Sequence, residues 1–186
     1  MKANLIRGCF FCHATDVQMT EKKNRRSFHC LSCGKTSFRF FELSGPSKVK
    51  KTKDGFVHFS AGALIEKDGK YLIEKRAGYP FLHATLGGHV DKGETFEQAL
   101  NREVIEETGL NVKDKKLIFK GMISPDPCSR GVDLHDWRLY LVHADGTLRI
   151  SSESVNLRWL TKKQMARMKF TPPVEYIFKT LRFFSS

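Results

Sequence analysis

The chain has 186 residues, of which 40% are hydrophobic and 28% are charged, and its formal net charge at pH 7 is +12. This length suggests one globular domain, or one domain with a small additional module. No apolar run is long enough to cross a bilayer, and the first residues lack the apolar segment of a secretory signal. We therefore expect a cytoplasmic protein with no membrane partner.

Four of the five cysteines form two pairs near the N-terminus. Two residues separate Cys9 from Cys12 and Cys30 from Cys33, and 17 residues lie between the pairs. This spacing is typical of two knuckles that close one tetrahedral zinc site. Disulfides are the alternative, but cytosolic thiols are kept reduced. The pattern predicts a structural Zn²⁺ bound by all four thiolates, in a zinc ribbon that spans residues 1–45.

Most of the positive charge lies in this first part of the chain. Residues 1–55 carry 12 Lys or Arg against 4 Asp or Glu, and several phenylalanines lie among them. Such a module can bind the phosphates of RNA or DNA and stack on their bases. The alternative is that the phenylalanines pack the ribbon and the lysines keep the protein in solution. The basic candidates are Lys22, Lys23, Arg25, Arg26 and the lysines between 48 and 53.

Residues 46–55 are rich in turn formers and lysine, and we predict that they form a linker. Residues 56–186 have the pattern of one globular domain. Its first elements are predicted strands at 56–66 and 71–76, joined by a tight turn at 67–70.

The next segment, residues 88–110, places acids on a predicted helix. Glu103, Glu106 and Glu107 stand at i, i+3 and i+4, so their carboxylates share one helix face. The same stripe is apolar one or two turns earlier, which fits a purely solvated acidic face poorly. Oxygen ligands grouped in this way suit Mg²⁺ or Mn²⁺. The apolar members of the stripe are Phe96, Ala99 and Leu100.

The same segment resembles the signature of the Nudix hydrolases, Gly-x5-Glu-x7-Arg-Glu-U-x-Glu-Glu-x-Gly-U, in which U is aliphatic. The resemblance implies a loop–helix–loop that holds divalent metals against a substrate pyrophosphate. It also implies an α/β fold, an α/β/α sandwich on a mixed sheet, and it allows a homodimer. Every specified position is met, by Gly88, Glu94, Arg102, Glu103, Val104, Glu106, Glu107, Gly109 and Leu110.

The resemblance also implies roles for individual residues. Glu106 and Glu107 are the expected principal metal ligands, and Glu103 is a ligand or the base that accepts a proton from water. Arg102 is expected to hold Glu103 by a charge-assisted hydrogen bond. Three further residues complete the prediction: Gly87 as a carbonyl ligand, Glu94 as a support of the loop or a ligand through water, and Arg76 as a contact to substrate phosphate or a solvent-facing residue.

Beyond the helix, the chain is predicted to form strands at 116–123, 137–144 and 153–160, followed by helices from Thr161 and over 172–184. The loop at 124–133 is a candidate for substrate selection, and its Cys128 is interpreted as a loop or core thiol. In the family an acid shortly before an aromatic residue of the last strand often supplies a further ligand or base. Glu153 is the candidate here, with Asp133 and Asp136 as rivals.

Together these features predict metal-dependent hydrolysis of a pyrophosphate bond in a nucleoside-diphosphate-linked substrate. The ribbon ahead of the signature resembles the layout of the NADH pyrophosphatases, which cleave dinucleotides and can remove NAD caps from RNA. The chain lacks their Ser-Gln-Pro-Trp-Pro-Phe-Pro motif, so hydrolysis of NADH or NAD-capped RNA is an alternative. A second alternative is a regulator whose ribbon binds nucleic acid while the other domain senses a nucleotide.

Overall fold

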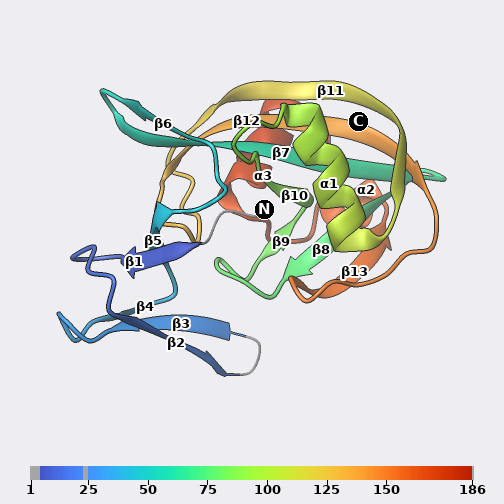
Figure 1. The fold of residues 1–186 in the computed structure, drawn as a ribbon. Helices are drawn as coiled ribbons and strands as arrows, with labels where there is room; N and C mark the ends of the chain where they lie inside the picture. The colour runs from blue at the N-terminus through green and yellow to red at the C-terminus, as the bar shows by residue number, and fades with distance from the viewer. Residues whose placement is uncertain (1–4, 23–24, 186) are drawn as a thin grey trace.

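The computed structural model describes residues 5–22 and 25–185. Lys23, one of the predicted basic residues, lies outside this range, as do the first four residues of the predicted ribbon. Figure 1 shows a small N-terminal β module beside a larger sheet that carries the helices. Among the described residues, no helix has the length and apolar character needed to span a membrane.

The N-terminal module consists of two small antiparallel sheets, β1 with β5 and β2 with β3 and β4. Between them the rings of Phe28 and Phe40 are buried, with centroids 4.9 Å apart. This apolar core is small, so a module of this size gains from an additional cross-link such as a metal ion. The strands are β1 (Ile6–Cys9), β2 (Val17–Lys22), β3 (Arg25–Cys30), β4 (Thr36–Ser37) and β5 (Phe40–Ser44).

The segment at 46–55, predicted to be a linker, contains a short strand. In the structure β6 (Val49–Thr52) pairs antiparallel with the start of β7 (Gly55–Lys67). The pairing uses backbone groups, and lysine is well suited to the exposed side chains of a short edge strand. The sequence therefore did not predict this strand, because its side chains include two lysines and show no apolar pattern.

The larger sheet is built around β7. Its main strand order is β11–β12–β7–β8–β13, with β12 parallel to β7 and the other neighbours antiparallel. Strands β6, β10 and β8 pair in turn with successive parts of the β7 edge that faces away from β12. The remaining strands are β8 (Lys70–Arg76), β9 (His83–Ala84), β10 (Leu86–His89), β11 (Asn111–Ile123), β12 (Leu134–Asp145) and β13 (Ser154–Leu160).

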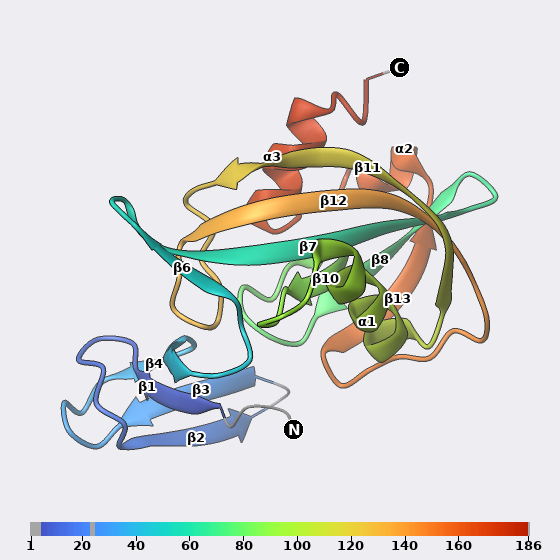
Figure 2. The same cartoon turned by 45° about the horizontal axis from the view of Figure 1, so that its top comes forward.

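Helices cover both faces of this sheet, as Figure 2 shows. Helix α1 (Phe96–Thr108) packs on one face, and α2 (Lys162–Met165) with α3 (Pro172–Thr180) packs on the other. In β7 the residues from Ala61 to Ile65 include side chains that enter both cores, which explains the continuous apolar run of this strand. The structure thus confirms the α/β/α sandwich on a mixed sheet.

Local sequence sets the ends of α1. At its start, Thr95 and Gln98 form a capping box in which each side chain accepts a hydrogen bond from the other residue's backbone N–H. At its end, Gly109 has a φ of 71°, and its N–H donates to the carbonyl of Ile105. The apolar stripe of the helix is buried, so its last two turns, which carry the glutamates, lie against the sheet beside β10.

Candidate active site

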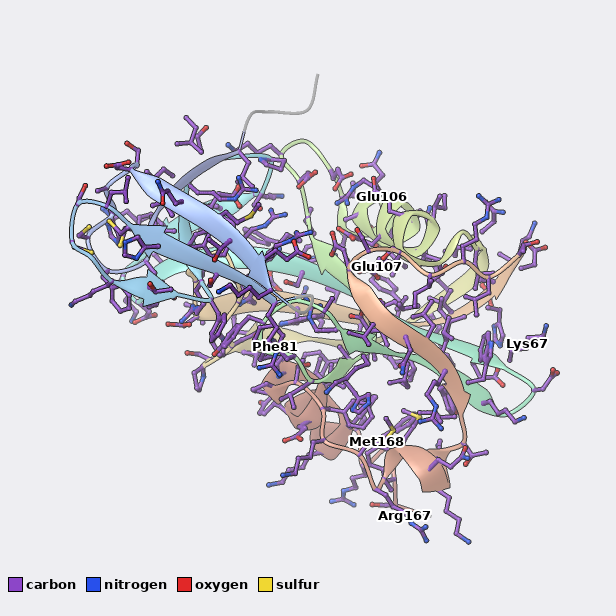
Figure 3. The ribbon with its side chains drawn as sticks, turned by 90° about the horizontal axis from the view of Figure 1, so that it is seen from below. Lys67, Phe81, Glu106, Glu107, Arg167 and Met168 are labelled. Atoms are coloured by element: carbon purple, nitrogen blue, oxygen red, sulfur yellow. The ribbon has the colours of Figure 1, made fainter. Side chains whose placement is uncertain are left out.

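Helix α1 places its three glutamates in unequal surroundings. The side chain of Glu103 is 13% exposed and that of Glu106 is 47% exposed, whereas Glu107 is 3% exposed. Figure 3 labels Glu106 and Glu107 on α1. The three carboxylates therefore form a graded series, from a buried anchor to a group open to solvent.

Arg102 organises the loop before the helix. Its guanidinium donates to both carboxylate oxygens of Glu94, at 2.8 and 2.9 Å, and to the carbonyl of His89 at 3.0 Å. It also donates to Glu103 at 2.7 Å, which is the contact expected between these two residues. Glu94 in addition accepts from the backbone N–H of Asp91 at 2.9 Å, so its carboxylate serves to hold the loop and Arg102.

The two glycines of β10 bring the backbone close to these carboxylates. Gly87 has a φ of 129°, and its N–H donates to Glu107 at 2.8 Å. A Cβ at this position would collide with the carbonyl oxygen of Ala61 on β7, so both conformation and space require glycine here. A Cβ at Gly88 would lie 2.5 Å from Oε1 of Glu103. The absence of side chains at both positions therefore leaves room for the glutamates.

Burial makes the ionised state of two of these carboxyls costly. It raises the pKa of Glu103 to about 7, although Arg102 opposes the shift. It also raises the pKa of Glu107, with the neighbouring carboxylates Glu74 and Glu103 adding to the effect. A divalent cation would remove both costs, and a group of carboxylate oxygens is the ligand set that Mg²⁺ prefers. The donors present thus fit a hard divalent ion.

Glu74 is part of this group, although the sequence analysis did not identify it. It is buried on β8, accepts a hydrogen bond from the hydroxyl of Ser154 at 2.6 Å, and has a raised pKa because of burial. The available signal was the alternation of β8, because Glu74 follows Leu72 on the strand face that packs towards α1. An acid in line with an apolar stripe marks a functional position.

Arg76 lies next along the same strand face. Its guanidinium donates to Glu74 at 3.3 Å. The negative charges of Glu74, Glu107 and Glu153 raise its pKa. Its Nε is buried without a hydrogen-bond partner. The side chain also lines the cavity that joins this site to the N-terminal module. Of the two placements predicted for Arg76, the structure thus has the one inside the site.

The three candidates for the distal acid occupy different places. Glu153 is exposed, lines the cavity, and is close enough to raise the pKa of both Glu74 and Glu103. Asp133 forms an ion pair with Arg39 at 2.6 Å, and Asp136 lies within β12 opposite Met122. Of these three acids, all in the described part of the chain, Glu153 alone lines the cavity.

A cavity of about 650 Å³ joins this site to the N-terminal module. One side is formed by the carboxylate group and the β10 glycines, and another by the loop at 124–133. The loop is held to the module by Arg39, which donates to the carbonyls of Cys128 and Val132 at 2.8 and 3.3 Å. Residues of the module that line the cavity are Leu5, Arg7, Met19, Glu21, Arg26, Phe28, Phe38 and Phe40.

The four N-terminal cysteines form one compact group. The Sγ atoms of Cys9 and Cys33 are 3.6 Å apart, and those of Cys12 and Cys30 are 3.7 Å apart. These separations are far longer than a disulfide bond of about 2.05 Å, and all four ligand atoms lie within 4.8 Å of one another. The prediction that they gather as separate thiols is confirmed, and the group can hold a metal ion.

Comparison with known proteins agrees with this geometry. A family model described as the NUDIX domain matches residues 57–181. An ADP-ribose pyrophosphatase of Methanocaldococcus jannaschii is 49% identical over 71 residues, which make up 37% of this chain and 41% of that protein. The NAD-capped RNA hydrolase NudC of Haemophilus influenzae is 28% identical over 104 residues, 56% of this chain and 35% of that protein. The chain thus spans less than half the length of these relatives.

Among solved structures, the MutT NUDIX hydrolase of Burkholderia pseudomallei superposes with a TM-score of 0.58 and 23% sequence identity. The match covers 66% of this chain and 96% of that one. At this identity the comparison shows a shared fold.

Proposed function

This chain belongs to the Nudix family, and from that premise we propose that it hydrolyses a pyrophosphate bond in a nucleotide or nucleotide derivative with the aid of Mg²⁺ or Mn²⁺. The observation that carries the proposal is that Glu103, Glu106 and Glu153 line one cavity, with the buried Glu107 bonded to Gly87 in its wall. We also propose that the four-cysteine group binds a structural Zn²⁺, since four thiolates fill a tetrahedral site.

Each residue then has a role in the reaction. Glu106, Glu107, Glu153 and the carbonyl of Gly87 would hold the divalent ion, which when bound neutralises phosphate oxygens and favours in-line attack by water. Glu103 is placed to accept a proton from the attacking water, because Arg102 holds its carboxylate at the cavity. One P–O bond forms with water, the bridging P–O bond breaks, and two phosphate products leave.

A substrate panel tests this proposal directly. The full chain would be incubated with nucleoside triphosphates, ADP-ribose, NADH, dinucleoside polyphosphates and capped RNA, each with Mg²⁺ or Mn²⁺ in ¹⁸O-labelled water. We expect cleavage that requires the metal, and the labelled product identifies which phosphorus water attacked. If protein that is shown to be folded by a cooperative thermal unfolding transition cleaves no pyrophosphate in the panel, the proposal is contradicted.

NAD-capped RNA and NADH form a second candidate substrate class, supported by a feature of the cavity. Arg7, Arg26 and Phe38 of the N-terminal module line the same cavity as Glu103. Cationic and aromatic side chains beside the site suit a substrate that continues as a polynucleotide. Comparison of kcat/KM for NADH and for an NAD-capped RNA tests it, because contacts to the RNA predict a higher and salt-sensitive value for the capped RNA.

The regulator hypothesis predicts a different outcome. The complete set of carboxylates favours an enzyme, since a nucleotide sensor does not need them for its fold. Salt-dependent binding of RNA or DNA that persists when Glu106 and Glu107 are both changed to Gln, with no hydrolysis by the unaltered chain, would support the regulator.

A further inference from the structure

A second group of metal-ligating side chains lies beside the cavity, apart from the glutamates. His58 lies on β7, His89 on β10 and His135 on β12, and Cys128 lies in the loop before β12. The ligand atoms that these four residues offer all lie within 4.8 Å of one another. Three strands that are far apart in the sequence, together with the loop before β12, thus bring three imidazoles and a thiol to one point.

Sheet register accounts for the gathering. His58 and His135 are direct partners in the parallel pairing of β7 and β12. His89 pairs with Ser60, two residues along β7 from His58. The ring centroids of His58 lie 4.7 Å from His89 and 5.5 Å from His135. The Sγ of Cys128 is 3.7 Å from Nδ1 of His58.

One nitrogen of this group, Nε2 of His89, is buried without a hydrogen bond. An unsatisfied buried polar atom is costly, so its position beside three other metal-ligating groups calls for a ligand.

We propose that His58, His89, Cys128 and His135 form a second metal site, which takes Zn²⁺. Imidazole nitrogen and thiolate sulfur suit zinc, whereas carboxylate oxygens suit Mg²⁺. Zinc bonds of about 2.0–2.3 Å in a tetrahedron separate neighbouring ligand atoms by roughly 3.3–3.8 Å, and the contact between Cys128 and His58 already has this length. All four ligand atoms lie within 4.8 Å of one another, so the other rings would have to close on the ion as it binds.

Asp126 has the position of a supporting residue. Its Oδ2 lies 3.3 Å from Nδ1 of His135 and accepts a hydrogen bond from Nε1 of Trp137 at 2.5 Å. A carboxylate beside a metal-binding imidazole commonly fixes the orientation of the ring. The buried Asp126 is therefore explained by the same site.

Four protein ligands leave no position for a water or substrate, so the site is structural. It would fasten the loop at 124–133 to the central strands. The loop also carries the carbonyl of Cys128 that accepts from Arg39 of the N-terminal module. The ion would thus fix the part of the cavity wall on which the module rests.

Metal content and X-ray absorption of the full chain test the proposal. We expect two zinc ions per chain, and an absorption spectrum that requires both an all-sulfur site and a site with three nitrogens and one sulfur. The Cys128→Ser and His58→Asn variants should each bind about one zinc, with the all-sulfur spectrum remaining. His143→Asn, at an exposed histidine outside the group, is the matched control and should bind as many zinc ions as the unaltered chain.

Spectroscopy on the unaltered chain keeps the test independent of how the variants fold. One zinc per chain with only sulfur ligands would overturn the proposal. One zinc with three nitrogens and one sulfur would support it, and would instead overturn the assignment of zinc to the four cysteines. Unchanged zinc content in folded Cys128→Ser and His58→Asn proteins would also overturn it.

Discussion

Two sides of one cavity bring buried polar groups together with different chemistry. On the α1 side the groups are carboxylates, and burial raises the pKa of Glu103 and Glu107. On the side of β7 and β12 they are imidazoles and a thiol, and Nε2 of His89 lacks a partner. Because oxygen donors and nitrogen or sulfur donors prefer different ions, we expect the two sides to bind different metals.

The largest expected effect is on the carboxylate side. Glu107→Gln keeps an oxygen to accept from the N–H of Gly87 but removes a negative charge. We expect kcat to fall by roughly 10²–10³-fold, with little change in Tm. The control Glu97→Gln alters the first turn of the same helix, where Glu97 accepts from Tyr140, and should leave turnover almost unchanged. Near-normal turnover in Glu107→Gln would contradict the proposal that α1 binds the metal.

Arg102→Lys addresses how the carboxylates are held. Lysine keeps the positive charge but cannot bond Glu94, Glu103 and the carbonyl of His89 together. We expect kcat/KM to fall by about 10–100-fold, and added Mg²⁺ should recover part of this loss if the change loosens the ligands. A loss that no metal concentration alters would show that Arg102 does not act through the metal site. Steady-state kinetics over a range of Mg²⁺ concentrations provide the measurement.

Arg7→Gln tests whether the N-terminal module contributes to substrate binding. Arg7 lines the cavity, and its Nε is buried without a hydrogen-bond partner. For a polyanionic substrate we expect KM to rise by about threefold to tenfold, as for the loss of one partly screened charge contact of ~1 kcal/mol, with kcat unchanged. Lys35→Gln removes a module charge outside the cavity and is the matched control. Equal KM values in both variants would exclude a substrate contact by Arg7.

Stability should also depend on pH. In buffer without Mg²⁺ or Mn²⁺, the folded protein holds the proton of Glu103 up to a pKa of about 7, whereas an unfolded chain releases it near about 4.3. The unfolded state binds fewer protons between these values, so the free energy of unfolding falls as the pH rises from about 4.3 to about 7 and then levels off. Thermal unfolding across this range measures the slope, and Glu103→Gln should reduce it; the part that remains belongs to Glu74 and Glu107, whose pKa values burial also raises. An unchanged slope in that variant would show that Glu103 does not contribute to it.

The sequence predicted the elements whose chemistry is local. The spacing of Glu103, Glu106 and Glu107 on one helix and the paired spacing of the cysteines each express a short-range rule, and the structure has both groups. The strand within the predicted linker was not anticipated, because β6 is defined by backbone pairing with β7, which its lysines do not reveal. Side-chain pattern alone cannot report such pairing.

Long-range register explains what the sequence did not show. Glu74 was accessible in principle, because it lies on an apolar face of β8. The group of His58, His89, Cys128 and His135 was not, since its members are spread over 78 positions and meet only through the pairing of β7 with β10 and β12. Which of Glu153, Asp133 and Asp136 lies at the cavity likewise depends on how the loops fold.

The pairing of β6 with β7 has a mechanical consequence. A flexible tether would let the N-terminal module swing open as a lid, but here the chain that leaves the module joins the hydrogen-bonded edge of the central strand at once. A swing of the module would have to turn at the end of β5, and it would break the hydrogen bonds that Phe40, Glu42 and Arg39 donate to the loop at 124–133. These contacts therefore hold the N-terminal side of the cavity in place.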